Sequence, residues 1–196
     1  MPRRAVRRLR LGIVFVGVCL GAVSLGAEPA PAPAPRTGLQ IGDLAPAFSL
    51  QTLDGKTLTR DSFKGQVVVL DFWATWCLPC RQALPELKDL RQKNAGQPLV
   101  LVSVSVDENR KAIESFVSGN GMSWPQAWDR EGRVTGGVFR ISDFPSYVVL
   151  DAEGRIAYRQ SGWSPGRSAA LLDEAVSKAL AASGKNPAKT DVAVRR

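Results

Sequence analysis

The sequence predicts a mixed α/β domain, and three features of it carry this prediction. Two apolar runs that are typical of buried strands, 67–73 and 99–106, flank a stretch with helical spacing. A strand, a helix and a second strand in that order imply parallel strands joined by a right-handed crossover. Near the end of the chain, 147–151 and 155–160 have the pattern of two strands, and the short turn Ala152-Glu153-Gly154 between them predicts an antiparallel hairpin.

The domain begins with a predicted β-hairpin. Residues 48–53 and 56–59 have strand-like composition, and the pair Asp54-Gly55 between them favours a turn. The next strand, 67–73, is apolar on both faces, which is typical of a strand in the middle of a sheet. We therefore expect a mixed central sheet, flanked by helices, with a hairpin at its N-terminal side.

The remaining predicted elements are mostly helices, indicated by helical spacing of apolar residues. The first helix is expected to run over 80–94 and to end at Gly96. The other predicted segments are, in chain order, a helix at 110–118, a short extended piece at 124–128, an irregular helix at 133–139 and an amphipathic helix at 165–182.

The chain of 196 residues is expected to contain one folded domain with additions at both ends. Residues 1–27 are predicted to be a signal peptide or an anchor, 28–38 a Pro/Ala linker, 39–184 the domain and 185–196 a disordered tail. The linker alternates Pro and Ala, which favours an extended polyproline II spacer.

The formal charge of +8 lies at the two ends of the chain. Five arginines within the first ten residues contribute +5 and residues 185–196 contribute +3, so the residues between carry no net charge. A nucleic-acid-binding domain is expected to carry a basic patch of its own. The sequence therefore predicts no nucleic-acid partner.

The N-terminal arginines precede an apolar run, 11–27, that contains no charged residue, an order typical of an export signal. Its length of about 17 residues is below the roughly 20 that span a bilayer, which favours a cleaved signal peptide. The small residues expected before a cleavage site are poorly matched, with Ser24-Leu25-Gly26 as the best candidate, so an uncleaved anchor stays open. By either route we expect a periplasmic or other extracytoplasmic location.

Cys77 and Cys80 are the candidate catalytic residues. They follow a predicted buried strand and lie at the first turn of a helix, where free backbone N–H groups and the helix dipole favour an anion. The thiolate is the nucleophile in disulfide exchange. We therefore expect Cys77 to attack a substrate disulfide and Cys80 to attack Cys77 in turn, closing a redox disulfide. The third cysteine, Cys19, lies in the apolar run.

Two other roles for this cysteine pair are weaker. A zinc site needs about four ligands, and the sequence contains no His and no second cysteine pair, so no metal is expected. A structural disulfide between residues so close in the chain would stabilise the fold little, because its effect grows with the length of the loop it closes.

The sequence around the cysteines resembles the active-site segment of the thioredoxin superfamily. The resemblance lies in 68–81, which reads Val-Val-Leu-Asp-Phe-Trp-Ala-Thr-Trp-Cys-Leu-Pro-Cys-Arg, and in Leu84-Pro85-Glu86-Leu87 after it. Four further features resemble the TlpA/ResA-like branch of this superfamily, which consists of membrane-side thiol–disulfide oxidoreductases often tied to cytochrome c maturation. They are the export segment, the early hairpin, an insert at 107–120 and an X-Pro pair before a late strand. The resemblance covers about 39–180 and implies a thioredoxin fold and no cofactor.

The resemblance assigns further roles by position. Asp71, six residues before Cys77, lies where thioredoxins place a buried acid that assists proton transfer at the deeper cysteine. Burial raises the pKa of a carboxyl group, so Asp71 can accept the Cys80 proton, unless its side chain faces solvent. The TlpA/ResA-like branch often has Asn here. Pro145 matches the cis-proline that faces the cysteines, an ordinary trans-proline being the alternative.

Trp76 is expected to shield Cys77 and, with Pro145, to bind the substrate, although packing in the core is the alternative for the indole. Glu108 matches the position of an acidic residue found near the cysteines in cytochrome-maturation members of the branch, with Asp107 as an equal rival.

These residues predict an exported thiol–disulfide oxidoreductase of protein-disulfide reductase type. The pair Leu78-Pro79 lacks the Pro-His of strongly oxidising relatives, which favours reduction. The resemblance implies protein clients, for example apocytochrome c, and a membrane thiol transporter as electron donor, and a monomer is expected. Two alternatives stay open, namely a peroxiredoxin-like peroxidase, which uses a lone nucleophilic cysteine, and a non-catalytic thioredoxin-like binding module.

Overall fold

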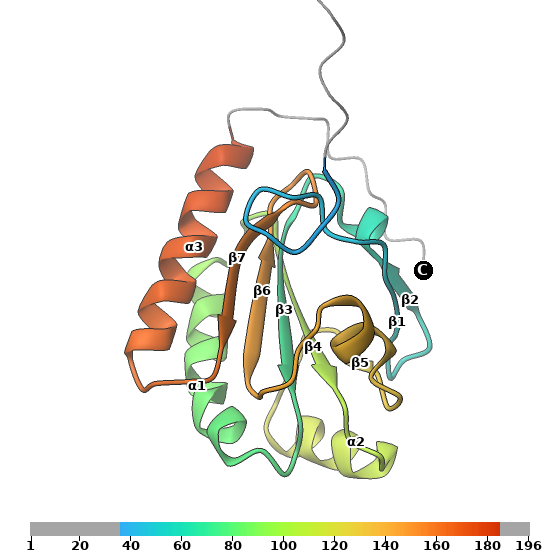
Figure 1. The fold of residues 1–196 in the computed structure, drawn as a ribbon. Coiled ribbons are helices and arrows are strands. Elements are labelled where there is room, and N and C mark those ends of the chain that lie inside the picture. Colours follow the sequence, from blue (N-terminus) through green and yellow to red (C-terminus); the bar gives the residue numbers. More distant parts are fainter. Residues whose placement is uncertain (1–35, 185–196) are drawn as a thin grey trace, which may run out of the picture. The chain divides into compact units, whose positions relative to one another are not determined.

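The computed structural model describes residues 36–184 (Figure 1). Its strands are β1 (Ser49–Gln51), β2 (Thr57–Thr59), β3 (Val67–Trp73), β4 (Leu99–Ser105), β5 (Gln126–Trp128), β6 (Ser146–Leu150) and β7 (Ile156–Ser161). Its helices are α1 (Leu78–Lys93), α2 (Arg110–Gly119) and α3 (Arg167–Ser183), with two short ones, η1 (Arg60–Phe63) and η2 (Arg133–Val138).

Five strands form the central sheet in the order β5-β4-β3-β6-β7. β3, β4 and β5 are parallel, whereas β6 is antiparallel to β3 and β7 is antiparallel to β6. All seven residues of β3 are buried, because this strand lies in the middle of the sheet and both of its faces are covered. In the register of the sheet, Asp71 on β3 lies between Ser103 on β4 and Tyr147 on β6.

Side chains of β3 alternate between two apolar clusters, one on each face of the sheet. Val67, Val69 and Trp73 belong to the cluster that α1 and α3 complete, and these two helices lie along the same face of the sheet (Figure 1). Leu70 and Phe72 belong to the second cluster, which the N-terminal segment, η1 and η2 complete. Burial of each such side chain contributes about 1.5–3 kcal/mol to stability.

The predicted N-terminal hairpin is a separate two-stranded sheet. Ser49 of β1 pairs with Thr59 of β2. Gly55 has a φ of 83° in the turn, a conformation that favours glycine because it has no Cβ. Thr52, just after β1, forms an isolated bridge with Ala127 of β5, so the hairpin is joined to the edge of the central sheet.

The predicted fold class is confirmed, because the structure has the mixed sheet, the flanking helices and the hairpin. Two details differ. The short 3-10 helix η1 was not expected from the sequence, and α1 begins at Leu78 rather than Cys80. Pro79 suits the first turn of a helix, since an N–H group there has no partner within the helix. The irregular helix expected at 133–139 is the π-helix η2.

The expected signal peptide or anchor at 1–27, most of the expected linker and the expected tail at 185–196 lie outside the described residues. Residues 36–38, also assigned to the linker, are hydrogen bonded to the domain. The Leu44 N–H donates to the Arg36 carbonyl (2.8 Å), and the Gly38 N–H donates to the Leu44 carbonyl (3.0 Å). Within residues 36–184, none of the helices has the length and apolar character that a membrane span requires.

Candidate active site

The two cysteines lie where β3 leads into α1. Cys77 is the N-cap residue of α1, and its Sγ accepts a hydrogen bond from the Cys80 N–H at 3.2 Å. The two side chains form a disulfide bond and are buried, with 5% and 7% of the residue surface exposed. Backbone N–H groups at a helix N-terminus stabilise an anion, so this position favours a thiolate at Cys77 once the disulfide is reduced.

Asp107 holds the loop that precedes Cys77. Its Oδ2 accepts hydrogen bonds from the Thr75 N–H (2.9 Å) and the Ser105 hydroxyl (2.7 Å), and its Oδ1 accepts one from the Thr75 hydroxyl (2.6 Å). Both oxygens of this buried carboxyl group are therefore paired. Glu108, its rival in the sequence analysis, is exposed. Asp107 is thus the acidic residue that contacts the cysteine loop, and its contacts position that loop.

Apolar side chains form the rim around the cysteines. Trp76 is 67% exposed, so it does not pack in the core, and Leu78 is 60% exposed. The ring of Phe144 meets that of Trp76 edge-on, with 6.1 Å between their centroids. The Phe144–Pro145 peptide bond is cis, as the resemblance implied. We call Trp76, Leu78, Phe144 and Pro145 the apolar rim.

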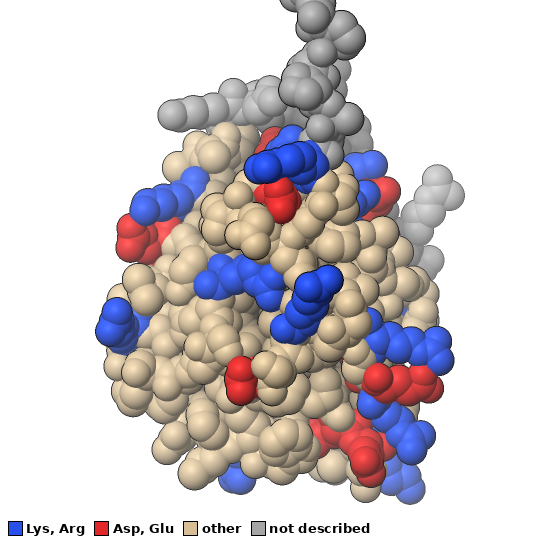
Figure 2. All heavy atoms as spheres, in the orientation of Figure 1, with Lys and Arg blue, Asp and Glu red and all other residues tan. Residues whose placement is uncertain are grey.

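On the face shown in Figure 2, the surface over the lower ends of α1 and β6 carries few charged side chains. Charged side chains are concentrated over the upper and right-hand parts of this face. Exposed apolar groups on an otherwise polar protein often mark an interaction site. The apolar rim is therefore a candidate contact surface for a partner.

Asp71 is buried on the face of β3 that α1 covers. By strand alternation it shares this face with Val69 and Trp73, which belong to the same apolar cluster as the two cysteines. Its residue surface is 2% exposed, and the Ser103 hydroxyl donates a hydrogen bond to Asp71 Oδ2 at 2.7 Å. Burial raises the pKa of Asp71 to about 7, with the Ser103 hydrogen bond acting in the opposite direction. The solvent-facing alternative for Asp71 is thereby excluded.

Three residues near Asp71 were not singled out from the sequence. Ser103 and Tyr147 flank it on the neighbouring strands, and Trp124 Nε1 donates a hydrogen bond to Ser103 Oγ at 2.9 Å. Burial, then the charges of Asp71 and Glu86, raise the pKa of Tyr147, so its phenol stays neutral. These residues come together through the register of the strands, which the sequence alone does not show.

Glu86 links α1 to the loop that follows β7. Its Oε2 accepts a hydrogen bond from Trp163 Nε1 (2.8 Å), and its Oε1 accepts one from the Gly166 N–H (3.0 Å). The same loop reaches the cis-proline, because the Gly162 N–H donates to the Pro145 carbonyl at 2.8 Å. Glu86 therefore helps to fix the distance between the cysteine helix and the cis-proline loop.

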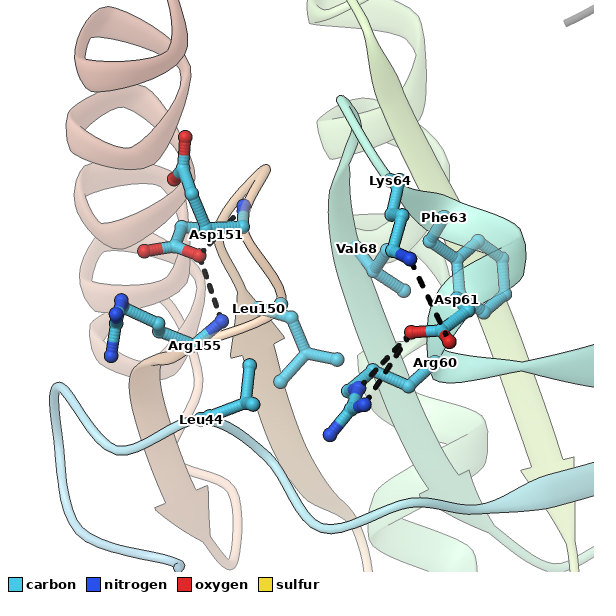
Figure 3. A pocket seen from close by; sticks show the side chains of 11 residues that line it. Leu44, Arg60, Asp61, Phe63, Lys64, Val68, Leu150, Asp151 and Arg155 are labelled. Carbon is cyan, nitrogen blue, oxygen red and sulfur yellow. Dashed lines mark hydrogen bonds and ion pairs between the residues drawn. The ribbon is translucent and has the colours of Figure 1, made fainter. Parts of the chain in front are cut away.

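A cavity of about 340 Å³ lies at the opposite end of the sheet from the cysteines (Figure 3). Val68, near the start of β3, and Leu150, at the end of β6, line it together with charged residues. Asp61 is paired there with Arg60 and Lys64, and Asp151, Glu153 and Arg155 also line the cavity, so the acidic and basic residues of its wall balance. The cavity has no cysteine in its wall and is not the reaction site. In the part of the chain that the structure describes, no group of three or more Cys, Asp and Glu residues could hold a metal ion.

The chain is similar to known proteins over the part that carries this site. The model of the AhpC/TSA family matches residues 41–159. The thioredoxin-like protein YneN of Bacillus subtilis (strain 168) is 35% identical over 124 residues, which cover 62% of this chain and 71% of YneN. The thiol–disulfide oxidoreductase ResA of Bacillus thuringiensis (strain Al Hakam) is 30% identical over 123 residues, which cover 63% of this chain and 70% of ResA.

A solved structure supports the same relation. The crystal structure of a thiol:disulfide interchange protein of the thioredoxin family from Chlorobium tepidum TLS matches with a TM-score of 0.59 and 30% sequence identity. The match covers 69% of this chain and 94% of that chain.

Proposed function

Because the chain belongs to the AhpC/TSA family and is a thiol–disulfide oxidoreductase with the thioredoxin fold, we propose that it reduces disulfide bonds of client proteins outside the cytoplasm. The observation that carries this proposal is the Cys77–Cys80 disulfide at the N-terminus of α1, with Asp71 buried on the same side of the sheet. This disulfide is the oxidised state in which the protein is left after it has reduced a client.

In the first step, the Cys77 thiolate attacks one sulfur of the client disulfide. A bond forms between Cys77 and that sulfur, the client disulfide breaks, and the second client sulfur leaves as a thiolate. The position of Cys77 as N-cap of α1 supports its role as the attacking group, because the helix N-terminus stabilises the thiolate.

In the second step, the Cys80 thiol gives its proton to the Asp71 carboxylate, and the Cys80 sulfur attacks Cys77 Sγ. The Cys77–Cys80 bond forms, the mixed disulfide breaks, and the client leaves with both sulfurs reduced. Two electrons have then passed from the protein to the client. A carboxyl group with a pKa of about 7 can take up and release this proton near neutral pH.

The next cycle needs a donor that returns two electrons to the Cys77–Cys80 disulfide. We propose a membrane thiol transporter for this step, on the resemblance of the chain to the TlpA/ResA-like branch. The same resemblance makes apocytochrome c a candidate client. The apolar rim is the proposed contact surface for both partners, since Trp76 and Leu78, on either side of Cys77 in the chain, are exposed and Phe144 meets the ring of Trp76 edge-on.

An insulin-reduction assay tests the activity. With dithiothreitol as electron source, the wild-type protein is expected to reduce insulin, and both Cys77→Ser and Cys80→Ser are expected to lose turnover. Cys19→Ser is the matched control and is expected to retain full activity, because this cysteine lies in the apolar run at 11–27. A wild-type protein that reduces hydrogen peroxide but not insulin would support the peroxidase instead. Client binding without either activity would support the non-catalytic module.

Trapping of the mixed disulfide identifies the client. A Cys80→Ser variant cannot carry out the second step, so clients stay bound to Cys77 and can be identified after non-reducing electrophoresis. A Cys77→Ser, Cys80→Ser double variant is the control. Recovery of a cytochrome c precursor with the single variant alone would support the proposed client. If the cells used produce cytochrome c and no such precursor is trapped, this part of the proposal would be contradicted.

Residues 1–38 carry the proposed extracytoplasmic location. A fusion of these residues to alkaline phosphatase, an enzyme that needs disulfides formed outside the cytoplasm, is expected to be active. Replacement of the five arginines and two apolar residues of 11–27 by Asp is expected to abolish that activity. An inactive wild-type fusion would contradict export.

A further inference from the structure

Three buried side chains form a row of hydrogen bonds that ends at Asp71. Trp124 Nε1 donates to Ser103 Oγ at 2.9 Å, and Ser103 Oγ donates to Asp71 Oδ2 at 2.7 Å. The residues are 6%, 0% and 2% exposed, respectively, so water does not replace these bonds. The row crosses three parts of the sheet, because Asp71 is on β3, Ser103 on β4 and Trp124 two residues before β5.

The chemistry of the indole fixes the direction of this row. An indole N–H can donate a hydrogen bond but cannot accept one, whereas a hydroxyl group can do both. Trp124 therefore occupies a lone pair of Ser103 Oγ and leaves the hydroxyl hydrogen free to point at Asp71. Ser103 is the one hydrogen-bond donor to the Asp71 carboxyl group among residues 36–184.

We propose that Ser103 is a positioning residue for proton transfer, which Trp124 orients, and that it keeps Asp71 available as the acceptor of the Cys80 proton. This inference rests on the proposed function. A hydroxyl that always donates to Oδ2 stabilises the charged carboxylate and leaves Oδ1 as the oxygen that takes up the proton. Without that donor, burial would hold Asp71 in its protonated form, which cannot accept a proton.

The other groups around Asp71 do not supply this stabilisation. Tyr147 on β6 stays neutral, because its own pKa is raised by burial and by the charges of Asp71 and Glu86. On α1, the two cysteines lie in the cluster on this face of the sheet and Glu86 is half-buried, and none of the three is a basic group. The other charged residues of α1 are exposed, namely Arg81, Lys88, Asp89, Arg91 and Lys93. The residues of α3 in the same cluster are apolar, namely Leu172, Val176 and Ala179. Of its charged residues, Asp173, Glu174 and Lys178 form ion pairs at the surface, and Arg167 is exposed.

The pKa of Asp71 agrees with this assignment. Burial raises the pKa from 3.8 to about 7, and the hydrogen bond from Ser103 is the one contribution that lowers it. No positive charge contributes to the pKa of Asp71. The Ser103 hydroxyl is therefore what limits the rise of this pKa.

The second step can be timed with an aromatic disulfide as the probe. In a stopped-flow reaction of the reduced protein with 5,5′-dithiobis(2-nitrobenzoate), the first thiolate is released when Cys77 attacks, and the second is released when Cys80 attacks Cys77. For Ser103→Ala, the pH midpoint of the second release is expected to move upward by about one unit. The second release at pH 7 is then expected to be about fivefold slower, because the ionised fraction of Asp71 falls from about half to about a tenth.

Two further variants separate positioning from packing. Trp124→Phe keeps an aromatic ring but removes the N–H, so a smaller upward shift of the same midpoint is expected. Ser103→Thr keeps the hydroxyl and is expected to restore the wild-type midpoint. Thr135→Val is the matched control, because it removes another buried hydroxyl that donates to a buried carboxylate, that of Asp129 (2.7 Å), and it is expected to leave the midpoint unchanged.

An Asp71→Asn background completes the test. In that background, Ser103→Ala is expected to have no further effect on the pH profile. Two results would overturn the positioning role in a protein that reduces disulfides. One is an unchanged midpoint in Ser103→Ala, and the other is a shift by Ser103→Ala in the Asp71→Asn background as large as in the wild-type background. A wild type that releases neither thiolate and does not reduce insulin would instead contradict the proposed function itself.

Discussion

Two buried aspartates, one on β3 and one just after the neighbouring strand β4, differ in the number of hydrogen bonds that their carboxyl groups receive. Asp107, just after β4, receives three hydrogen bonds, two from Thr75 and one from Ser105. Asp71, in the middle of β3, receives one, from Ser103. The two residues are almost equally buried, at 4% and 2% exposed.

The difference shows that burial alone does not decide what an acidic residue does. The three donors around Asp107 tie its carboxyl group to the cysteine loop, which suits a group that holds structure. At Asp71, the single donor lowers the pKa less than burial raises it, so the pKa is raised to about 7. Such a pKa suits a group that exchanges a proton near neutral pH. We therefore propose that the active site combines one acid that positions the loop with another that changes its protonation.

The largest expected effect concerns the way in which the free energy of unfolding depends on pH. The pKa of Asp71 is raised in the folded protein, so the folded state binds this proton more tightly than the unfolded state does. The stability it contributes is present below about pH 4 and is lost as the pH rises to about 7. Asp71→Asn is therefore expected to gain about 4 kcal/mol relative to wild type between pH 4 and pH 8, as an upper bound.

Urea denaturation of the oxidised proteins at several pH values measures this difference. Subtraction of the wild-type curve from that of Asp71→Asn removes the contributions of the other acids. A difference that stays constant from pH 4 to pH 8 would show that Asp71 does not titrate in this range.

The next effect concerns the rate of the Cys80 step. Asn cannot accept a proton, so Asp71→Asn is expected to slow the second thiolate release near pH 7 about 100-fold, a typical contribution of a general base. The first release, in which Cys77 attacks, is expected to change much less. If both releases slow equally, Asp71 acts on the whole site rather than on the proton of Cys80.

The smallest of the three effects separates the two aspartates. Asp107→Ala leaves the Thr75 N–H and two hydroxyl groups without their acceptor, so the free energy of unfolding is expected to fall by about 2 kcal/mol. The pH midpoint of the Cys80 step is expected to stay as in wild type. A shifted midpoint without loss of stability would mean that Asp107, and not Asp71, sets the proton transfer.

Much of the fold followed from the order of apolar runs. The apolar character of residues 67–73 favoured an interior position for Asp71, since a central strand is covered on both faces, and the structure removed the solvent-facing alternative. The cysteine spacing, together with a strand before it and a helix after it, located the redox centre, and the resemblance implied the cis-proline.

The partners of Asp71 could not be predicted in the same way. Ser103 is 32 residues away in sequence and becomes its neighbour only through the register of two parallel strands. Trp124 comes from a third segment, and its indole reaches Ser103 through the packing of the core. The choice between Asp107 and Glu108 was open for a similar reason, because the turn after β4, not the strand pattern, decides which side chain points to the loop.

The most direct measurement is a titration of the Asp71 carboxyl carbon in the oxidised protein by 13C NMR, with Asp71→Asn used to assign its signal. We predict that this carbon titrates with a midpoint near pH 7, as expected for a carboxyl group whose burial outweighs its one hydrogen bond. A midpoint near pH 4, the ordinary value for an aspartate, would contradict the role of Asp71 as the acceptor of the Cys80 proton.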